Sequence, residues 1–226
     1  MAEEAPVIAI DGPSGSGKGT VSRAVAHALG WHFLDSGALY RLVALQGLKQ
    51  GLDPDDEAGH ARLAEQMRIR FGSRPDGSEQ IFLEGTDVTR DLRSEATGNA
   101  ASRVAAMVAV RSALFGRQQT FAETPGLVAD GRDMGTVVFP TAGLKIFLTA
   151  SLEERAQRRH KQLKDKGLDV SLAALSREIA GRDARDTGRK VAPLKAAADA
   201  VVLDSTGLDV EEVVARVLRL ARERFG

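Results

Sequence analysis

The sequence predicts an α/β protein built on a doubly wound, parallel five-stranded sheet with helices on both faces. Short apolar runs without strict alternation are typical of strands buried on both faces, and helical patterns separate them. The expected strands cover residues 7–10, 32–34, 127–129, 144–148 and 200–203. Because ligands of such sheets bind outside the carboxyl ends of the strands, the polar residues there are candidates for a site.

The first strand leads into a glycine-rich loop that ends in Gly-Lys, and a helical stretch at residues 21–29 follows. Strand, glycine loop and helix are the context of a phosphate-binding loop, or P-loop. The glycines let successive backbone N–H groups point at an anion, and the helix N-terminus adds partial positive charge. Lys18 can reach the β- and γ-phosphates of a nucleoside triphosphate. A flexible turn is the alternative interpretation.

The loop departs from the usual pattern directly after Lys18. Gly19 stands where most such loops carry the Ser or Thr that holds Mg²⁺, and the hydroxyl comes one residue later, at Thr20. We therefore expect Mg²⁺ to be held less directly, with Thr20 or Ser16 contributing. Asp130 is the nearest candidate carboxylate, although a turn residue or helix cap would explain it too.

Residues 67–89 break the strand–helix alternation. Apolar and polar residues alternate around Pro75-Asp76-Gly77, which is typical of an antiparallel hairpin. We expect a small inserted antiparallel β subdomain, which is either decorative or closes over a second substrate.

Two capping pairs place helices in the second half of the chain. Ser151 with Glu154 predicts a helix directly after the strand at 144–148, and Asp209 with Glu212 predicts the start of the last helix.

Arginines crowd the first of these helices and a later segment. Arg155 and Arg159 are expected on a solvated helix face, in intrahelical ion pairs. The run at residues 182–190 fits that account less well, because Thr187-Gly188 should break a helix there. A mobile arginine-bearing segment near a triphosphate could exclude water and neutralise charge.

The composition argues against several classes of protein. Lys+Arg and Asp+Glu are both 31 in 226 residues, which argues against a general nucleic-acid or membrane-surface binder. The chain has no cysteine, and its 4 histidines form no metal-ligand pattern. The acidic start, Met1 to Glu4, is not a signal peptide, and no apolar run is long enough for a membrane span. A soluble cytoplasmic protein is expected.

The residues also favour one kind of phosphoryl acceptor. No Ser-His-Asp arrangement suggests nucleophilic catalysis. Transfer to a phosphate needs no protein base, because the acceptor oxygen is already ionised at neutral pH, and positioning with charge neutralisation suffices. A hydroxyl acceptor would call for a positioned Asp or Glu.

Four segments together resemble the bacterial cytidylate kinases, from about residue 6 to residue 221. They are Ile10 to Thr20, Leu34 to Arg41, Ala129 to Pro140 and Arg182 to Asp186. The resemblance implies transfer of the γ-phosphoryl group of ATP to CMP or dCMP, with Mg²⁺. We also expect a monomer. It also implies a core at residues 1–62 and 104–226, a nucleoside-monophosphate-binding insert at 63–103 and a lid at about 155–190.

The resemblance also implies roles for residues at matching positions. The residues that the resemblance implies in ATP binding are Gly12, Pro13, Ser14, Gly15, Ser16, Gly17, Lys18, Gly19, Thr20 and Arg158. Contacts to the acceptor fall to Ser36, Tyr40, Arg41, Ser102, Arg111, Asp130, Arg132, Asp133, Arg182, Asp186 and Arg189. Lys18, Arg132 and Arg189 would be catalytic, and Thr20 would serve the metal.

The implied base contacts suit cytosine. Asp133 can accept from the amino group while Arg111 and Ser102 donate to N3 and O2, and uracil would face the carboxylate with a carbonyl. Without the resemblance, Arg111 would pass for a surface charge. Two rivals stay open: a small kinase acting on UMP, AMP or shikimate, and a module that uses ATP as a switch.

Overall fold

The computed structural model describes residues 5–73, 79–165, 167 and 169–226. The chain divides into two compact units. Met1–Asp35 and Gln118–Gly226 form the first, here called the sheet unit, and Ser36–Arg117 form the second, the helical unit. The insert predicted at residues 63–103 lies within the helical unit, and its functional bounds stay a prediction.

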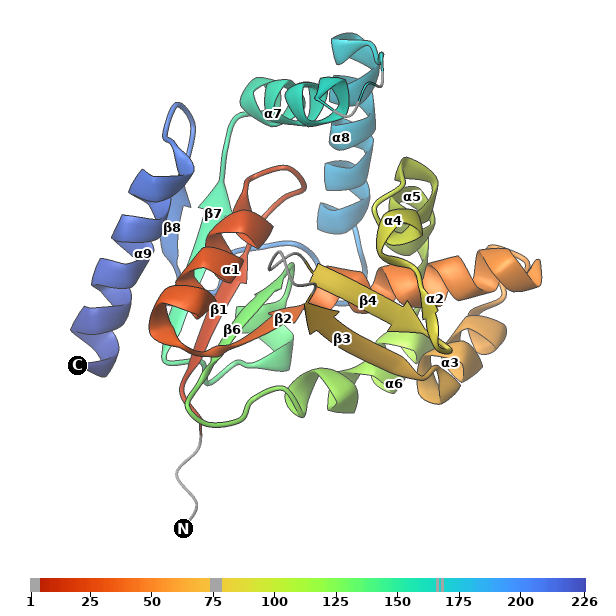
Figure 1. Cartoon of the computed structure of the whole chain (residues 1–226), viewed down its shortest axis with the longest axis horizontal. Coiled ribbons are helices and arrows are strands. Elements are labelled where there is room, and N and C mark those ends of the chain that lie inside the picture. The colour runs from red at the N-terminus through yellow and green to blue at the C-terminus, as the bar shows by residue number, and fades with distance from the viewer. Residues whose placement is uncertain (1–4, 74–78, 166, 168) are drawn as a thin grey trace. The chain divides into compact units, whose positions relative to one another are not determined.

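The sheet unit contains the predicted parallel sheet (Figure 1). Its strands are β1 (Val7–Asp11), β2 (His32–Asp35), β6 (Leu127–Gly131), β7 (Leu144–Thr149) and β8 (Val201–Asp204). Their order is β2-β6-β1-β7-β8, and every pair is parallel. This confirms the five-stranded α/β fold, because parallel neighbouring strands must be joined by crossover connections.

Each strand runs one or two residues further at its carboxyl end than the apolar pattern predicts. The added residues include four aspartates, Asp11, Asp35, Asp130 and Asp204, and Asp35 of β2 is the register partner of Asp130 of β6. Asp130 is buried inside β6, so the interpretation of it as a turn residue or helix cap is wrong. The ladder hydrogen bonds of neighbouring strands continue past the last apolar side chain and carry these carboxylates into the sheet edge.

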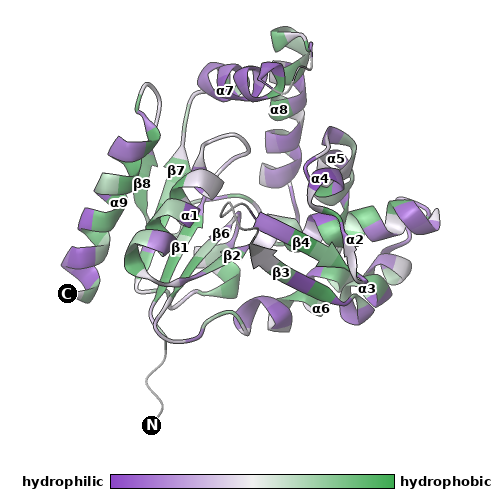
Figure 2. Ribbon diagram, in the orientation of Figure 1, coloured by the Kyte–Doolittle hydropathy of each residue, from purple (hydrophilic) through white to green (hydrophobic). Residues whose placement is uncertain are grey.

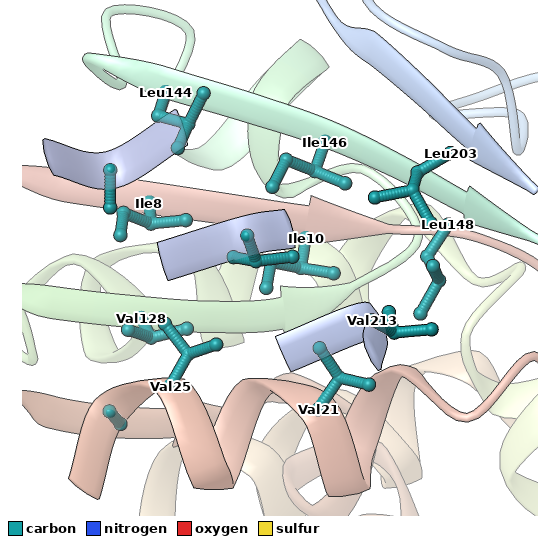
Figure 3. Close-up of a cluster of buried hydrophobic side chains, with 13 residues drawn as sticks. Ile8, Ile10, Val21, Val25, Val128, Leu144, Ile146, Leu148, Leu203 and Val213 are labelled. Carbon is teal, nitrogen blue, oxygen red and sulfur yellow. The ribbon is translucent and has the colours of Figure 1, made fainter. Parts of the chain in front are cut away.

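The core of this unit lies between the sheet and two helices, α1 (Lys18–Leu29) and α9 (Val210–Phe225). Figure 3 shows Ile8 and Ile10 of β1 in the same buried cluster as Val21 and Val25 of α1. Burying each such aliphatic side chain contributes about 1.5–3 kcal/mol to folding. The capping box predicted at Asp209 is present, so α9 begins where the sequence indicates.

Three further helices follow the strands of the sheet unit. The short π-helix η1 (Met134–Val138) packs on β1 and β6, and α7 (Leu152–Lys164) packs on α8 (Leu172–Thr187). Ser151 caps α7 by accepting from the N–H of Glu154, as predicted, and α8 ends before Gly188. Figure 2 shows α7 as largely hydrophilic, in contrast to the strands of the sheet.

The helical unit contains helices that pack mainly against α2 (Ser36–Gln50), and a small antiparallel sheet. Its other helices are α3 (Glu57–Gln66), α4 (Thr89–Leu92), α5 (Glu95–Val104) and most of α6 (Val108–Gln119). Strands β3 (Ile69–Ser73), β4 (Glu79–Leu83) and β5 (Thr86–Asp87) form an antiparallel sheet. This confirms the predicted antiparallel subdomain, while its Pro75-Asp76-Gly77 turn lies outside the described residues. No described helix has the length and apolar character needed to cross a bilayer.

Candidate active site

The phosphate loop, residues 12–20, connects β1 to α1 as predicted. Gly12 cannot be replaced, because a Cβ there would lie 2.0 Å from the carbonyl oxygen of Leu148 on β7. Gly17 is left-handed, with φ of 89°, and precedes the helix as its N-cap. Lys18 is buried and its Nζ donates to the carbonyl oxygen of Pro13, 3.0 Å away. The loop is thus curled with its lysine inside it, as anion binding requires.

The surroundings of Lys18 are rich in charge. Burial is the main cause that lowers the pKa of Lys18, with the Arg132 cation second, and Asp130, Asp186 and Asp35 oppose the shift. Burial likewise raises the pKa of Asp130, and the nearby Lys18 cation lowers it in part. A polyphosphate beside Lys18 would favour its charged form, because an opposite charge at short range offsets desolvation.

Asp130 also explains the unusual glycine after the lysine. A Cβ at Gly19 would lie 3.1 Å from Oδ2 of Asp130. A serine or threonine at this position would therefore crowd the carboxylate. Ser16 of the loop is buried, and its Oγ has no hydrogen-bond partner among the described residues. Thr20 is exposed in the first turn of α1.

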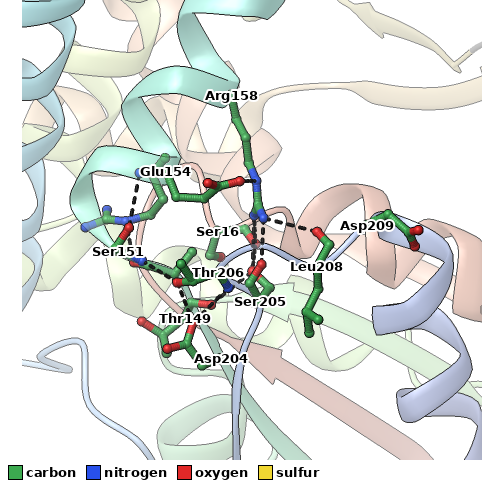
Figure 4. Close-up of polar contacts among 12 residues, drawn as sticks. Ser16, Thr149, Ser151, Glu154, Arg158, Asp204, Ser205, Thr206, Leu208 and Asp209 are labelled. Carbon is green, nitrogen blue, oxygen red and sulfur yellow. Dashed lines mark hydrogen bonds and ion pairs between the residues drawn. The ribbon is translucent and has the colours of Figure 1, made fainter.

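Two arginines of α7 hold the backbone of the loop. Arg158, predicted to touch ATP, donates to the side chain and carbonyl of Ser205 at 3.1 and 2.7 Å and lies 3.4 Å from the carbonyl oxygen of Ser16 (Figure 4). Its Nε also pairs with Glu154. Arg158 therefore lies against the predicted ATP loop, with its guanidinium bonded to protein groups.

Arg155 corrects an expectation. It is 6% exposed and not on a solvated face. Its guanidinium donates to the carbonyl oxygens of Ser14 and Ala150 and pairs with Asp183 of α8 at 2.7 Å. Its place in the first turn of a helix that directly follows a sheet strand is the one sequence signal that could have indicated this role.

A second group of charged residues lies where β6 ends and α8 approaches it. One carboxylate oxygen of Asp186 accepts from Nε of Arg132 at 3.0 Å, and the other pairs with Arg189. We call Arg132, Asp186 and Arg189 the arginine cluster. The structure thus brings together three residues that the resemblance selected. Arg182, a fourth, pairs with Glu178 one turn earlier on α8.

The predicted acceptor residues of the helical unit form a separate group. Ser36 and Tyr40 are buried at the start of α2, and Arg41 donates to the carbonyl oxygen of Leu92 at 2.9 Å. Arg111 is 8% exposed, with its guanidinium 5.6 Å from the centre of the Tyr40 ring. It is therefore no surface charge. Ser102 is half-buried on α5.

The sheet unit carries the parts of a P-loop phosphotransferase: a phosphate loop, a buried lysine and arginines around one carboxylate. The family model for cytidylate kinase matches residues 8–223, and the chain belongs to that family. The chain is 58% identical to the cytidylate kinase of Stutzerimonas stutzeri (strain A1501), over 99% of this chain and 98% of the relative. It is 55% identical to that of Aeromonas salmonicida (strain A449), over 100% and 98%.

Among solved structures, a gluconokinase from Sinorhizobium meliloti 1021 is similar at a TM-score of 0.49 and 16% identity. That match covers 97% of this chain and 93% of the gluconokinase chain.

Proposed function

We propose that the chain transfers the γ-phosphoryl group of ATP to CMP or dCMP, giving ADP and CDP or dCDP. The observation that carries the proposal is membership of the cytidylate kinase family over residues 8–223. The geometry of the sheet unit agrees with it, because a phosphate loop and an arginine cluster can bind a donor and an acceptor that are both anionic.

In the reaction, an ionised oxygen of the CMP phosphate attacks the γ-phosphorus of ATP. The bond from that phosphorus to the bridging oxygen breaks, and ADP leaves with the electron pair. The loop N–H groups and Lys18 would hold the donor phosphates. Arg132 and Arg189 would exchange part of their bonding to Asp186 for the acceptor phosphate and the transferring group, and so neutralise charge as it shifts.

Mg²⁺ is part of the proposal, and the residues present fit it. Among the described residues no group of three or more His, Asp or Glu could hold a metal ion. Mg²⁺ in kinases is bound chiefly by substrate phosphates and water, so such a group is not required. The buried hydroxyl of Ser16 and the exposed one of Thr20 would contribute oxygen donors, with Asp130 nearby. The ion would neutralise charge on the β- and γ-phosphates.

The remaining site roles are also part of the proposal. The cytosine ring would be recognised by Asp133, Arg111 and Ser102. The monophosphate site would be lined by Ser36, Tyr40 and Arg41. The sugar would be contacted by Asp186 and Arg182. Asp133 and Arg111 are both buried, which makes a mismatched base costly because its partners stay unpaired. We propose further that the protein is a monomer and acts in the cytoplasm.

A coupled assay of ADP release tests the proposal. ATP and Mg²⁺ are offered with CMP, dCMP, UMP, AMP, shikimate or no acceptor. Rapid release with CMP and dCMP alone is expected. Turnover with another acceptor instead would support phosphoryl transfer but overturn the base assignments. Slow ADP release at the same rate with and without every acceptor would favour an ATP-driven switch.

A further inference from the structure

Asp11 is a buried carboxylate to which the proposed reaction gives no role. It is the last residue of β1 and is 5% exposed. Side chains alternate along a strand, so Asp11 and Ala9 face away from the core that Ile8 and Ile10 form with α1. They face η1, where Ala9 lies 3.5 Å from the position of a Cβ added to Gly135. Asp11 is thus the polar end of the strand face that η1 covers.

Its two oxygens bind two successive backbone groups of η1. Oδ1 accepts from the N–H of Met134 and Oδ2 from the N–H of Gly135, both at 2.8 Å. Met134 and Gly135 are buried, so these N–H groups need partners within the protein. Asp133, the N-cap residue, makes no side-chain capping bond. Asp11 therefore caps η1 from another strand, in place of the residue that would do so locally.

We propose that Asp11 is a positioning residue for the phosphoryl acceptor, because it anchors the segment that carries Arg132 and Asp133. The inference rests on the proposed function of those two residues. Asp11 directly precedes Gly12, so one carboxylate ties the start of the phosphate loop to the start of η1. It sets the spacing between the segment that holds the donor and the segment that holds the acceptor, and transfer rates are sensitive to shifts of about 1 Å.

The electrostatics support this role. Burial raises the pKa of Asp11 to about 6, and the nearby Asp133 charge raises it too. The N–H groups of Gly135 and Met134 and the Lys18 cation lower it. The two N–H bonds favour the ionised form of Asp11, in which both oxygens act as acceptors.

Asp11→Asn is the sharpest test, since it keeps the shape but turns an NH₂ group toward one of the two N–H groups. We expect the KM for CMP to rise roughly tenfold and the preference for CMP over UMP to fall, with the KM for ATP unchanged. Amide hydrogen exchange at Met134 and Gly135 should become faster. Asp209→Asn is the matched control: Asp209 accepts from the N–H of Glu212 at 2.7 Å at the start of α9, and the same kinetic constants should stay at wild-type values.

The outcomes separate the possibilities. Faster exchange at Met134 and Gly135 with an unchanged KM for CMP would overturn the positioning role. A raised KM for ATP alone would overturn it too, by showing that Asp11 acts on the phosphate loop. A fall in kcat that matches the fraction of unfolded protein, with both KM values unchanged, would also contradict it, because it would indicate loss of folded enzyme and no displacement of the acceptor segment.

Two further variants keep the test decisive. If Asp11→Asn does not fold, Asp11→Glu keeps the charge and both acceptor oxygens but shifts them by one methylene group, and the same change in the KM for CMP is expected. Arg132→Ala tests the proposed function separately. If that variant binds CMP normally, the acceptor assignment has failed whatever Asp11 does, whereas a raised KM there and none in the Asp11 variants sinks only the positioning role.

Discussion

The phosphate loop and the arginine cluster are both suited to bind phosphate, but they are built in different ways. The loop presents backbone N–H groups and a lysine from residues adjacent in the sequence, and close contacts such as that of Gly12 with Leu148 shape it. In the cluster, two guanidinium groups from different segments meet on the carboxylate of Asp186. Backbone groups are fixed by the fold, whereas the arginines depend on an ion pair that a ligand can replace. Variants should therefore affect the two regions differently.

The largest effect is expected at the loop. Lys18→Ala should lower kcat roughly 1,000-fold, because a preorganised donor to developing charge is worth about 4 kcal/mol. ATP should still bind, since the backbone N–H groups remain. Steady-state kinetics and ATP-binding calorimetry measure the two effects. Lys161→Ala, at an exposed position on α7, is the control, and near-normal turnover by a folded Lys18→Ala protein refutes the phosphate role.

Arg132→Ala should separate the cluster from the loop. We expect kcat to fall roughly 100-fold and the KM for CMP to rise, with the KM for ATP unchanged, because this cation serves the acceptor and the transferring group. Initial rates over a grid of ATP and CMP concentrations give all three constants. Arg219→Ala, whose side chain is 71% exposed, should behave as wild type. A change confined to the KM for ATP would contradict the assignment of the phosphate loop to the donor and of the arginine cluster to the acceptor.

Arg155→Ala tests how the loop is held in place. Removing the guanidinium leaves Asp183 without this partner and frees the carbonyl oxygen of Ser14. Since Asp183 is 22% exposed, water offsets part of the loss, and unfolding free energy should fall by about 2 kcal/mol. Urea denaturation measures it. Arg159→Ala, which loses a contact with Gln162 on the same helix, should cost at most about 0.5 kcal/mol, and equal losses would count against the account of Arg155.

The smallest effect is expected for Asp133→Asn, beside the cluster. The asparagine can offer a donor to uracil, so the ratio of kcat/KM for CMP to that for UMP should fall roughly tenfold. Turnover with saturating CMP should change less than in Arg132→Ala. Competition between CMP and UMP in one reaction measures the ratio directly. An unchanged ratio would remove Asp133 from base recognition while leaving the cluster intact.

How much of the site could be predicted from the sequence differs between the two regions. The phosphate loop was predictable in full, since residues 12–20 are contiguous and a strand and a helix flank them. The run at residues 182–190 was visible in the sequence, but the roles of Arg132, Asp186 and Arg189 came from the family resemblance. Asp186 and Arg189 are three residues apart, whereas no local pattern pairs Arg132 with Asp186, because they are 54 residues apart. Asp11 was visible only as part of the first motif, and its partner amide at Met134 is 123 residues away.

The sequence by itself determined the parallel sheet, the antiparallel subdomain, the capped helices and the phosphate loop. Those features depend on local hydrophobic periodicity and on glycines and caps at fixed spacing, which act over a few residues. Tertiary structure alone decided that Arg155 is buried against the loop, that Asp130 lies beside Gly19, and that Asp11 caps η1. These contacts join residues far apart in the chain, and they form because crossovers bring the carboxyl ends of parallel strands to the same edge of the sheet.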